Sequence, residues 1–131
     1  MIALLDTHIL IRWIDSEKKL SAAHRRIVRS AGASSPLWIS DISLWEVAML
    51  HDLGRIRLRF PLRDWLERAA APPLVRRIGI SPAVAAEVAS LPAAFQRDPA
   101  DRIIVASARV LGATLLTDDS RTIEAGLVPT L

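Results

Sequence analysis

The sequence predicts an α/β fold, a three-layer sandwich in which a short parallel sheet of four to five strands is covered by helices on both faces. The strand-like segments are continuous apolar runs, which is typical of strands buried on both faces. Segments with helical periodicity separate these runs. At 131 residues the chain has the length of one domain, and no linker or internal repeat divides it. We therefore expect a single domain over residues 1–131.

Each expected element has local support in the sequence. We expect strands at residues 2–5, 37–39, 74–80 and 113–117, with a short final strand near Val128. We expect helices at residues 7–14, 21–29, 41–53, 61–70, 82–91 and 99–111. Ser81 and Asp98 are N-cap residues, and each is followed by proline at the first helical position. Gly54 and Gly112 supply the glycine at which helices commonly end.

The composition excludes several classes of protein. Hydrophobic residues make up 51% and charged residues 24% of the chain, which excludes disordered and fibrous proteins. There is no cysteine, which excludes disulfides, thiolate zinc sites and cysteine nucleophiles. No apolar run approaches the roughly 20 residues of a membrane span, so we expect a cytoplasmic protein without a membrane partner.

The charge is weakly informative about partners. The net charge is +3, and fifteen of the seventeen basic residues are arginine, the side chain that binds phosphate in a bidentate manner. Polyanions are therefore plausible partners, but ordinary surface solubility explains the same composition equally well.

Four acidic residues are expected to meet at one end of the sheet. Asp6 and Asp119 each follow an expected strand, and open parallel sheets bind ligands at the carboxyl ends of their strands. At about 100° per residue, Glu46 and Asp101 each fall on the apolar face of their helix. Asp118, next to Asp119, is the weaker candidate of that pair.

Like charges gathered in this way need a positive partner. Two carboxylates about 4 Å apart repel by roughly 4 kcal/mol at an effective dielectric constant near 20, and burial of an unpaired carboxylate is costly. Carboxylate oxygens, in a chain with three scattered histidines and no cysteine, favour a hard divalent cation. We therefore expect these acids to bind Mg²⁺ or Mn²⁺.

Each acid also has a purely structural interpretation. Asp98 is a natural N-cap, and Asp6 and Asp119 are each able to cap the element that follows. Asp101 is also a first-turn acid of the kind that the helix dipole favours, and an arginine from another helix could neutralise Glu46. Capping is an insufficient explanation for four acids directed at one crevice, although the role of Asp98 stays open.

Three stretches of the sequence, taken together, resemble a known family. They are Leu4-Leu5-Asp6-Thr7, the segment Ser43-Leu44-Trp45-Glu46-Val47-Ala48-Met49, and residues 97–106 followed by Leu116-Thr117-Asp118-Asp119. In this order and spacing they resemble the PIN-domain ribonucleases and, among these, the VapC-type toxins of bacterial toxin–antitoxin pairs. The resemblance covers nearly the whole chain. Position 8 is His, where many relatives carry Asn.

The resemblance implies a PIN-like nuclease domain that acts as a metal-dependent endoribonuclease toxin. The residues that it assigns to the metal and to catalysis are Asp6, Glu46, Asp101 and Asp119, with Asp98 as a less settled metal ligand. Thr117 matches a hydroxyl residue beside that site, and Thr7 is the other expected support. The resemblance also implies an RNA substrate, a homodimer and an antitoxin that docks near the active site. Two functions stay open beside it, a housekeeping RNA-processing nuclease and a catalytically silent interaction module of the same fold.

Four arginines that lie near the acids in the sequence are candidates to bind RNA phosphates. They are Arg97, Arg102, Arg109 and Arg121. For each of them an ordinary solvated arginine is the alternative.

The tryptophans give expectations about packing and partners. Trp38 and Trp45 are expected in the core. A hydrophobic groove formed by the first helices is the candidate surface for an antitoxin. The residues expected to line it include Trp13, Trp45, Phe60 and Trp65.

Overall fold

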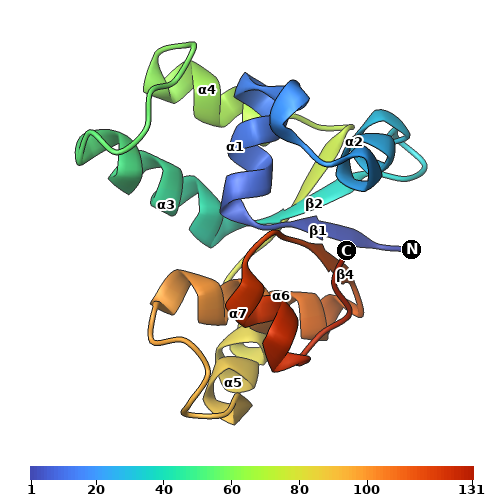
Figure 1. Ribbon diagram of the computed structural model, residues 1–131, viewed down its shortest axis with the longest axis vertical. Helices are drawn as coiled ribbons and strands as arrows, with labels where there is room; N and C mark the ends of the chain where they lie inside the picture. The colour runs from blue at the N-terminus through green and yellow to red at the C-terminus, as the bar shows by residue number, and fades with distance from the viewer.

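The computed structural model describes residues 1–131 and contains a four-stranded parallel sheet in the order β3-β2-β1-β4 (Figure 1). The strands are β1 (Ala3–Leu5), β2 (Leu37–Ser40), β3 (Val75–Ile78) and β4 (Thr114–Leu116). In the central strand β1, Leu5 lies opposite Ile39 of β2 and Leu116 of β4. The predicted fold class, a short parallel sheet between helices, is confirmed.

Seven α-helices cover the two faces of the sheet. They are α1 (Thr7–Asp15), α2 (Ala22–Arg29), α3 (Asp41–Asp52), α4 (Leu62–Ala69), α5 (Pro82–Ser90), α6 (Pro99–Leu111) and α7 (Ser120–Ala125), with a 3-10 turn at Glu17–Lys19. Figure 1 shows α1 to α4 above the sheet and α5 to α7 below it. The predicted caps form: the Ser81 hydroxyl accepts from the Val84 N–H at 3.3 Å, and Gly112 ends α6 with φ at 64°. None of these helices has the length and hydropathy to cross a membrane.

The two faces of the sheet have separate hydrophobic cores because successive strand residues point to opposite sides. Leu5 packs with Ile39 and Trp65 in one core, whereas Leu4 packs with Leu115 in the other. All five side chains are at most 1% exposed. The continuous apolar runs of the sequence therefore reflect strands that are buried on both faces.

The C-terminal segment differs from the prediction. Instead of a strand near Val128, the structure has a single parallel bridge between Leu115 and Thr130. The Leu115 N–H donates to Pro129 O at 2.9 Å, and the Leu131 N–H donates to Leu115 O at 3.0 Å. The Thr117 N–H also donates to Leu131 O at 3.2 Å. Because Pro129 has no N–H, the ladder does not extend back toward Val128. Helix α7, which the sequence analysis did not predict, lies directly before it.

Two tryptophans contradict the sequence predictions. Trp45 is 56% exposed rather than part of the core, because α3 turns Ser43 and Glu46 inward instead. Trp65 is fully buried, and its Nε1 donates to Asp15 Oδ1 at 2.8 Å. The prediction that Trp65 lines a partner groove is therefore wrong.

Candidate active site

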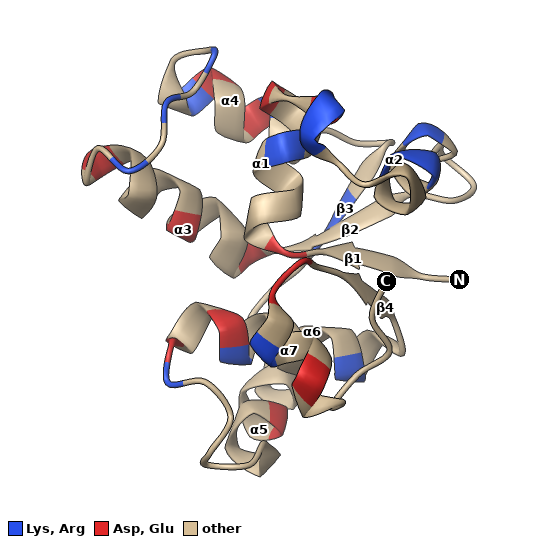
Figure 2. Cartoon of the chain, viewed as in Figure 1, with Lys and Arg blue, Asp and Glu red and all other residues tan.

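Acidic side chains from four elements lie beyond the carboxyl ends of β1 and β4. Asp6 follows β1, Asp119 follows β4, Glu46 lies in α3 and Asp101 lies in the first turn of α6. Figure 2 shows the acidic segments after β1 and after β4 next to each other. With Asp98, these residues form what we call the acid cluster.

Asp6 is held at the junction of strand and helix. Its Oδ1 accepts from the Ile9 N–H at 3.0 Å, which makes it the N-cap of α1, and its Oδ2 accepts from the Thr117 hydroxyl. Burial raises the pKa of Asp6 and outweighs these hydrogen bonds, which lower it. Asp6 therefore caps α1 in a place where burial disfavours its negative charge. Capping alone does not explain an acid at this position.

Glu46 is a buried carboxylate, only 7% exposed. Burial raises its pKa, a hydrogen bond from Thr7 lowers it, and the negative charges of Asp98 and Asp6 raise it further. Thr7 also shares a hydrogen bond with Ser43, with 3.0 Å between Oγ1 and Oγ. Thr7 of α1 and Ser43 of α3 are thus the hydroxyl residues beside the Glu46 carboxylate.

The pKa of Asp101 is affected by all the other acids of the cluster. Burial, followed by the negative charges of Asp98, Glu46, Asp119 and Asp6, raises the pKa of Asp101 to about 7. Each of the other four acids acts on this one side chain. Ile104, Val105 and Ala108 on the same face of α6 are buried, so Asp101 lies on the inward face that the helical periodicity predicts.

Asp119 is the acid that is best supplied with hydrogen bonds. It caps α7, because its Oδ2 accepts from the Thr122 hydroxyl at 2.7 Å and from the Thr122 N–H at 3.3 Å, and it also accepts from Gln96 Nε2. Burial raises the pKa of Asp119, but the hydrogen bonds from Thr122 and Gln96 outweigh burial and lower it. Its own N–H donates to Thr117 Oγ1 at 3.0 Å, so one hydroxyl joins Asp119 to Asp6.

The two remaining acids of these motifs differ in their surroundings. Asp98 caps α6, with its Oδ1 accepting from the Ala100 N–H at 2.9 Å, and its charge also raises the pKa of Asp101. Asp118 instead forms an ion pair with Arg12. Asp98 thus both caps α6 and belongs to the acid cluster, whereas Asp118 lies outside the cluster.

No arginine or lysine forms an ion pair with the acid cluster. None of the six ion pairs includes any of its members, so the alternative that an arginine neutralises Glu46 is wrong. Its donors are carboxylate oxygens only, which fit Mg²⁺ or Mn²⁺. The side chains as they stand do not form a group of three ligands. This arrangement fits an ion that is held by one or two carboxylates and completed by water and phosphate.

Two of the four candidate arginines make structural contacts instead. The Arg109 Nε donates to Glu87 at 2.6 Å. The Arg102 guanidinium donates at 3.0 to 3.4 Å to the backbone carbonyls of Val88, Leu91, Pro92, Phe95 and Gln96. Arg97 and Arg121 are exposed and make no ion pair or hydrogen bond, so these two keep their guanidinium groups free for a ligand.

Ser43 and Gln96 were missed by the sequence analysis as residues near the cluster, and His8 was noted only as a departure from the family. Ser43 lies one turn before Glu46 on the same helix face, so the spacing of i and i+3 could have revealed it. Gln96 lies in the loop before α6, where no periodicity indicates direction. His8 is exposed, and its positive charge when protonated lowers the pKa of Asp6 and Glu46, an effect smaller than that of burial.

Comparison with known proteins gives matches along almost the whole chain. The model of the PIN domain matches residues 3–126. Ribonuclease VapC22 of Mycobacterium tuberculosis is 39% identical over 118 residues, which are 90% of this chain and 87% of that protein.

Solved structures show the same fold at low sequence identity. VapBC2 from Rickettsia felis, bound to a DNA fragment from its promoter, has a TM-score of 0.71 at 16% identity, covering 100% of this chain and 98% of the other. A toxin–antitoxin complex from Klebsiella pneumoniae has a TM-score of 0.66 at 20% identity, covering 98% of this chain and 95% of the other. The match to residues 3–126 and the relative at 39% identity agree with this fold. The chain belongs to the PIN-domain family.

Proposed function

We propose that the chain is one nuclease domain over residues 1–131, which hydrolyses RNA phosphodiester bonds with Mg²⁺ or Mn²⁺ and acts as the toxin of a toxin–antitoxin pair. The observation that carries the proposal is the acid cluster, in which carboxylates from four elements gather without an ion pair to arginine or lysine. The similarity to Ribonuclease VapC22 supports RNA as the substrate. The similarity to VapBC2 and to the toxin–antitoxin complex supports an antitoxin as the partner.

The proposed site assigns a role to each acid. The candidate metal ligands and catalytic residues are Asp6, Glu46, Asp101 and Asp119, with Asp98 as an additional ligand candidate. One or two of these carboxylates would bind an ion directly, and the others would act through water. When bound, Mg²⁺ or Mn²⁺ would lower the pKa of a water molecule and offset the charge of the scissile phosphate. The carboxylates would hold that ion, and its positive charge would offset the repulsion among them.

Neutral side chains orient the carboxylates. Thr117 donates to Asp6, and a hydrogen bond from Thr7 reaches Glu46. Asp119 accepts from the side chains of Gln96 and Thr122. These hydrogen bonds restrict the directions of the carboxylates, which reduces the reorganisation that the reaction requires.

Arg97 and Arg121 are the proposed phosphate contacts outside the acid cluster. A negatively charged cluster repels RNA, so basic groups beside it are needed to hold the neighbouring phosphates. Both guanidinium groups are exposed and unpaired in the structure. Arg102 and Arg109 are not part of this proposal, because backbone carbonyls and Glu87 already occupy them.

We further propose an antitoxin contact at α3, a homodimer and a cytoplasmic location. Trp45 exposes 56% of its surface directly beside Glu46 in the sequence, which offers an apolar contact close to the acid cluster. Light scattering on the purified chain tests the dimer. Co-purification of a small DNA-binding protein encoded next to the chain tests the antitoxin.

The decisive test of the proposed function is cleavage of total RNA by the purified chain. We expect cleavage with Mn²⁺ or Mg²⁺, none with EDTA, and none with Asp101→Asn. Asp64→Asn is the matched control, since Asp64 is also a first-turn acid, of α4, but is exposed and outside the cluster. Cleavage that resists EDTA, or equal turnover by Asp101→Asn, would contradict the proposal.

The ends of the RNA products test the chemistry separately. Attack by water predicts 5′-phosphate and 3′-hydroxyl ends. Ends with a 2′,3′-cyclic phosphate would mean that the RNA 2′-hydroxyl is the nucleophile, which the proposed mechanism does not allow.

Two other functions make different predictions for the same protein. A housekeeping nuclease would cleave RNA without arresting growth on expression, whereas a toxin would arrest growth until the neighbouring gene is co-expressed. A silent interaction module would neither bind Mn²⁺ nor cleave. The acid cluster favours a nuclease over the silent module, because repelling carboxylates are costly to keep without an ion.

A further inference from the structure

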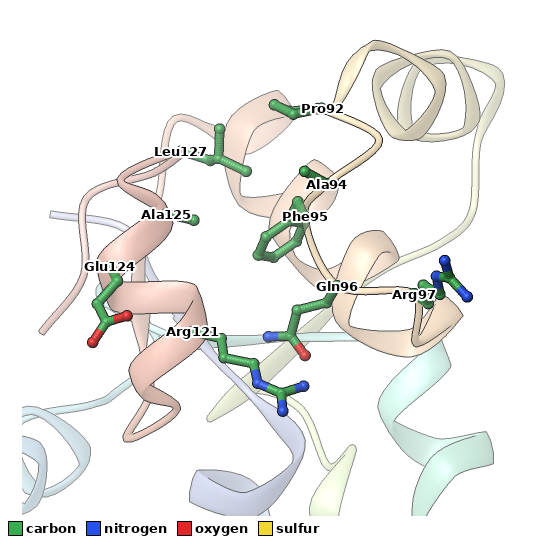
Figure 3. Close-up of a pocket in the computed structure, with 9 residues that line it drawn as sticks. All are labelled: Pro92, Ala94, Phe95, Gln96, Arg97, Arg121, Glu124, Ala125 and Leu127. Atoms are coloured by element: carbon green, nitrogen blue, oxygen red, sulfur yellow. The ribbon is translucent and has the colours of Figure 1, made fainter.

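A cavity of about 590 Å³ opens next to the acid cluster, between the loop that precedes α6 and helix α7 (Figure 3). Phe95, Ala94, Ala125 and Leu127 form its apolar part. Figure 3 shows the Phe95 ring between the two walls. The volume lies in the range of about 300–1,000 Å³ that is typical of sites for small ligands.

One side chain joins this cavity to the acid cluster. Gln96 lines the cavity, and its Nε2 donates to Asp119 and, at 3.1 Å, to the Thr122 hydroxyl. Both amide hydrogens are used in this way, so a ligand in the cavity would meet Oε1, which accepts no hydrogen bond from the protein. Any ligand in the cavity therefore lies next to a proposed catalytic acid and meets a free acceptor atom.

The charges around the cavity are suited to an anionic ligand. Arg97 and Arg121 both line it, and neither makes an ion pair or a hydrogen bond. Figure 3 shows Arg121 on the same side of the cavity as Gln96, whereas Arg97 and Glu124 lie at opposite rims with their charged groups turned outward. In the chain, Arg97 directly precedes Asp98 and Arg121 lies two positions after Asp119, so both positive groups belong to segments of the acid cluster.

We propose that this cavity binds the base of a nucleotide adjacent to the scissile phosphate in single-stranded RNA, with Arg121 and Arg97 on the flanking phosphates. The inference rests on the proposed function, since it places the cavity beside a phosphodiester that the acid cluster hydrolyses. Phe95 is only 7% exposed, so its ring is not a free stacking platform. An unstacked base would instead pack on the exposed apolar wall of the cavity and be read along its polar edge. Every base carries an N–H on its edge that is able to donate to the free Gln96 Oε1. The pocket therefore selects a nucleobase over a bare sugar phosphate.

A nucleotide fits these observations better than a peptide does. An apolar peptide segment would leave Arg97 and Arg121 without a counter-charge, and an acidic peptide would meet the repulsion of the neighbouring acid cluster. A nucleotide supplies a flat base for the apolar part and a phosphate for the two arginines. A protein occupant, an antitoxin or a second copy of the chain, is the alternative outcome of the test.

The experiment fills the cavity and leaves the acid cluster untouched. Ala125→Trp and Ala94→Trp each place a large side chain at an exposed wall position, so two independent variants guard against misfolding of one. Ala23→Trp, an exposed alanine of α2 on the other side of the sheet, is the matched control. The probes are a fluorescein-labelled single-stranded hexaribonucleotide and six versions of it, each with one abasic nucleotide. Binding is measured by fluorescence anisotropy in EDTA, and cleavage is measured in Mn²⁺.

We expect one abasic position to weaken binding to the wild-type chain about 10-fold, since the missing base removes both the apolar contacts and the hydrogen bond to Gln96. Ala125→Trp and Ala94→Trp should weaken binding of the intact probe by a similar factor and remove the effect of that abasic position. Ala23→Trp should behave as the wild type. The inference would be overturned if the wild type bound the intact probe and all abasic probes with equal affinity. It would also be overturned if the filled variants lost the same factor of affinity for the intact probe and for the abasic probes.

The same experiment separates this inference from the proposed function. If the wild type cleaves RNA while the filled variants keep its affinity and base preference, the cavity proposal fails and the nuclease proposal stands. If those variants instead lose dimerisation or antitoxin binding, the cavity belongs to a protein partner and the inference is wrong. If the wild type neither binds nor cleaves the probes, both proposals fail.

Discussion

Thr117, the residue after β4, donates its hydroxyl hydrogen to Oδ2 of Asp6, the residue after β1. The parallel register pairs Leu5 with Leu116, so the next residue on each strand is brought to the same edge of the sheet. The fold itself thus determines that the first acid of the cluster has a hydroxyl partner from a segment more than a hundred residues away.

This contact predicts a defect for Thr117→Val. Valine keeps the shape of the buried side chain but removes the donor, so Asp6 loses orientation and the pKa of Asp6 rises further. We expect the rate of RNA cleavage to fall about 10- to 100-fold, the usual effect of removing a residue that orients a metal ligand. Thr117→Ser keeps the hydroxyl and should retain most of the activity. Equal activity of the valine and serine variants would show that the hydrogen bond is dispensable.

The raised pKa of Asp101 predicts how the stability of the metal-free chain depends on pH. The pKa is 3.8 in the unfolded chain and about 7 in the folded chain, so the folded state holds the proton more tightly. This contribution to stability is complete below about pH 3.8 and is lost as the pH rises to about 7.

Asp101→Asn removes this penalty. In EDTA at pH 8 we expect the variant to be more stable by about 1 kcal/mol, allowing for solvent screening, which raises Tm by roughly 3–5 °C in a domain of this length. At pH 4 the two proteins should have nearly equal Tm values. Calorimetric or fluorescence melting at both pH values decides, and a variant that is destabilised at pH 8 would contradict the idea that the acids repel one another.

Arg102 is predicted to be a structural residue. Its two terminal nitrogens donate to five backbone carbonyls between Val88 and Gln96, and this contact joins the end of α5 to the loop before α6. Hydrogen bonds to a charged group contribute about 1.5–3 kcal/mol each when partners are left unpaired. We expect Arg102→Ala to lower the free energy of unfolding in urea by about 2 kcal/mol or more.

Two controls make that prediction specific. Arg102→Lys should not restore stability, because an ammonium group cannot reach carbonyls on both sides as the planar guanidinium does. Arg97→Ala, at an exposed position with no hydrogen bond, should change stability by less than about 0.5 kcal/mol. A stable Arg102→Ala variant with weakened RNA binding would instead favour a phosphate contact.

Arg121 is predicted to bind a phosphate of RNA. For single strands, each neutralised phosphate contributes about 0.7 to the slope of log K against log salt concentration. We expect Arg121→Gln to reduce the slope by about that amount and to weaken binding of all sequences alike. Arg57→Gln, at an exposed and unpaired position in the segment between α3 and α4, is the control. An unchanged slope for Arg121→Gln would rule out the contact.

Much of the fold could be predicted from the sequence because it depends on local patterns. Leu4 and Leu5 are both apolar, which is possible only where each face of the strand is covered. Asp98 followed by Pro99, and Gly112 at the other end, define α6 by capping alone. The inward direction of Asp101 likewise follows from helical periodicity, since Ile104, Val105 and Ala108 on its face are buried. Glu46 is buried as expected, but on a face with Ser43 and Val47 and not with Trp45.

What could not be predicted depends on long-range contacts. The helical period placed Trp45 among apolar residues of α3, but the neighbouring helices and the sheet cover the face of Ser43 and Val47 instead. The long side chain of Arg102 reaches carbonyls that no sequence spacing indicates. Gln96 binds Asp119 across 23 positions from a loop without periodicity, so only the folded structure reveals it.

Titration of the purified metal-free chain with Mn²⁺, followed by calorimetry, tests the central claim most directly. The account predicts saturable binding to the wild type and at least a tenfold weaker affinity for Asp6→Asn and Asp101→Asn, with Asp64→Asn unchanged. A wild-type chain that binds no Mn²⁺, or variants of Asp6 and Asp101 that bind it as tightly as the wild type, would contradict the claim that these carboxylates gather to hold a divalent ion.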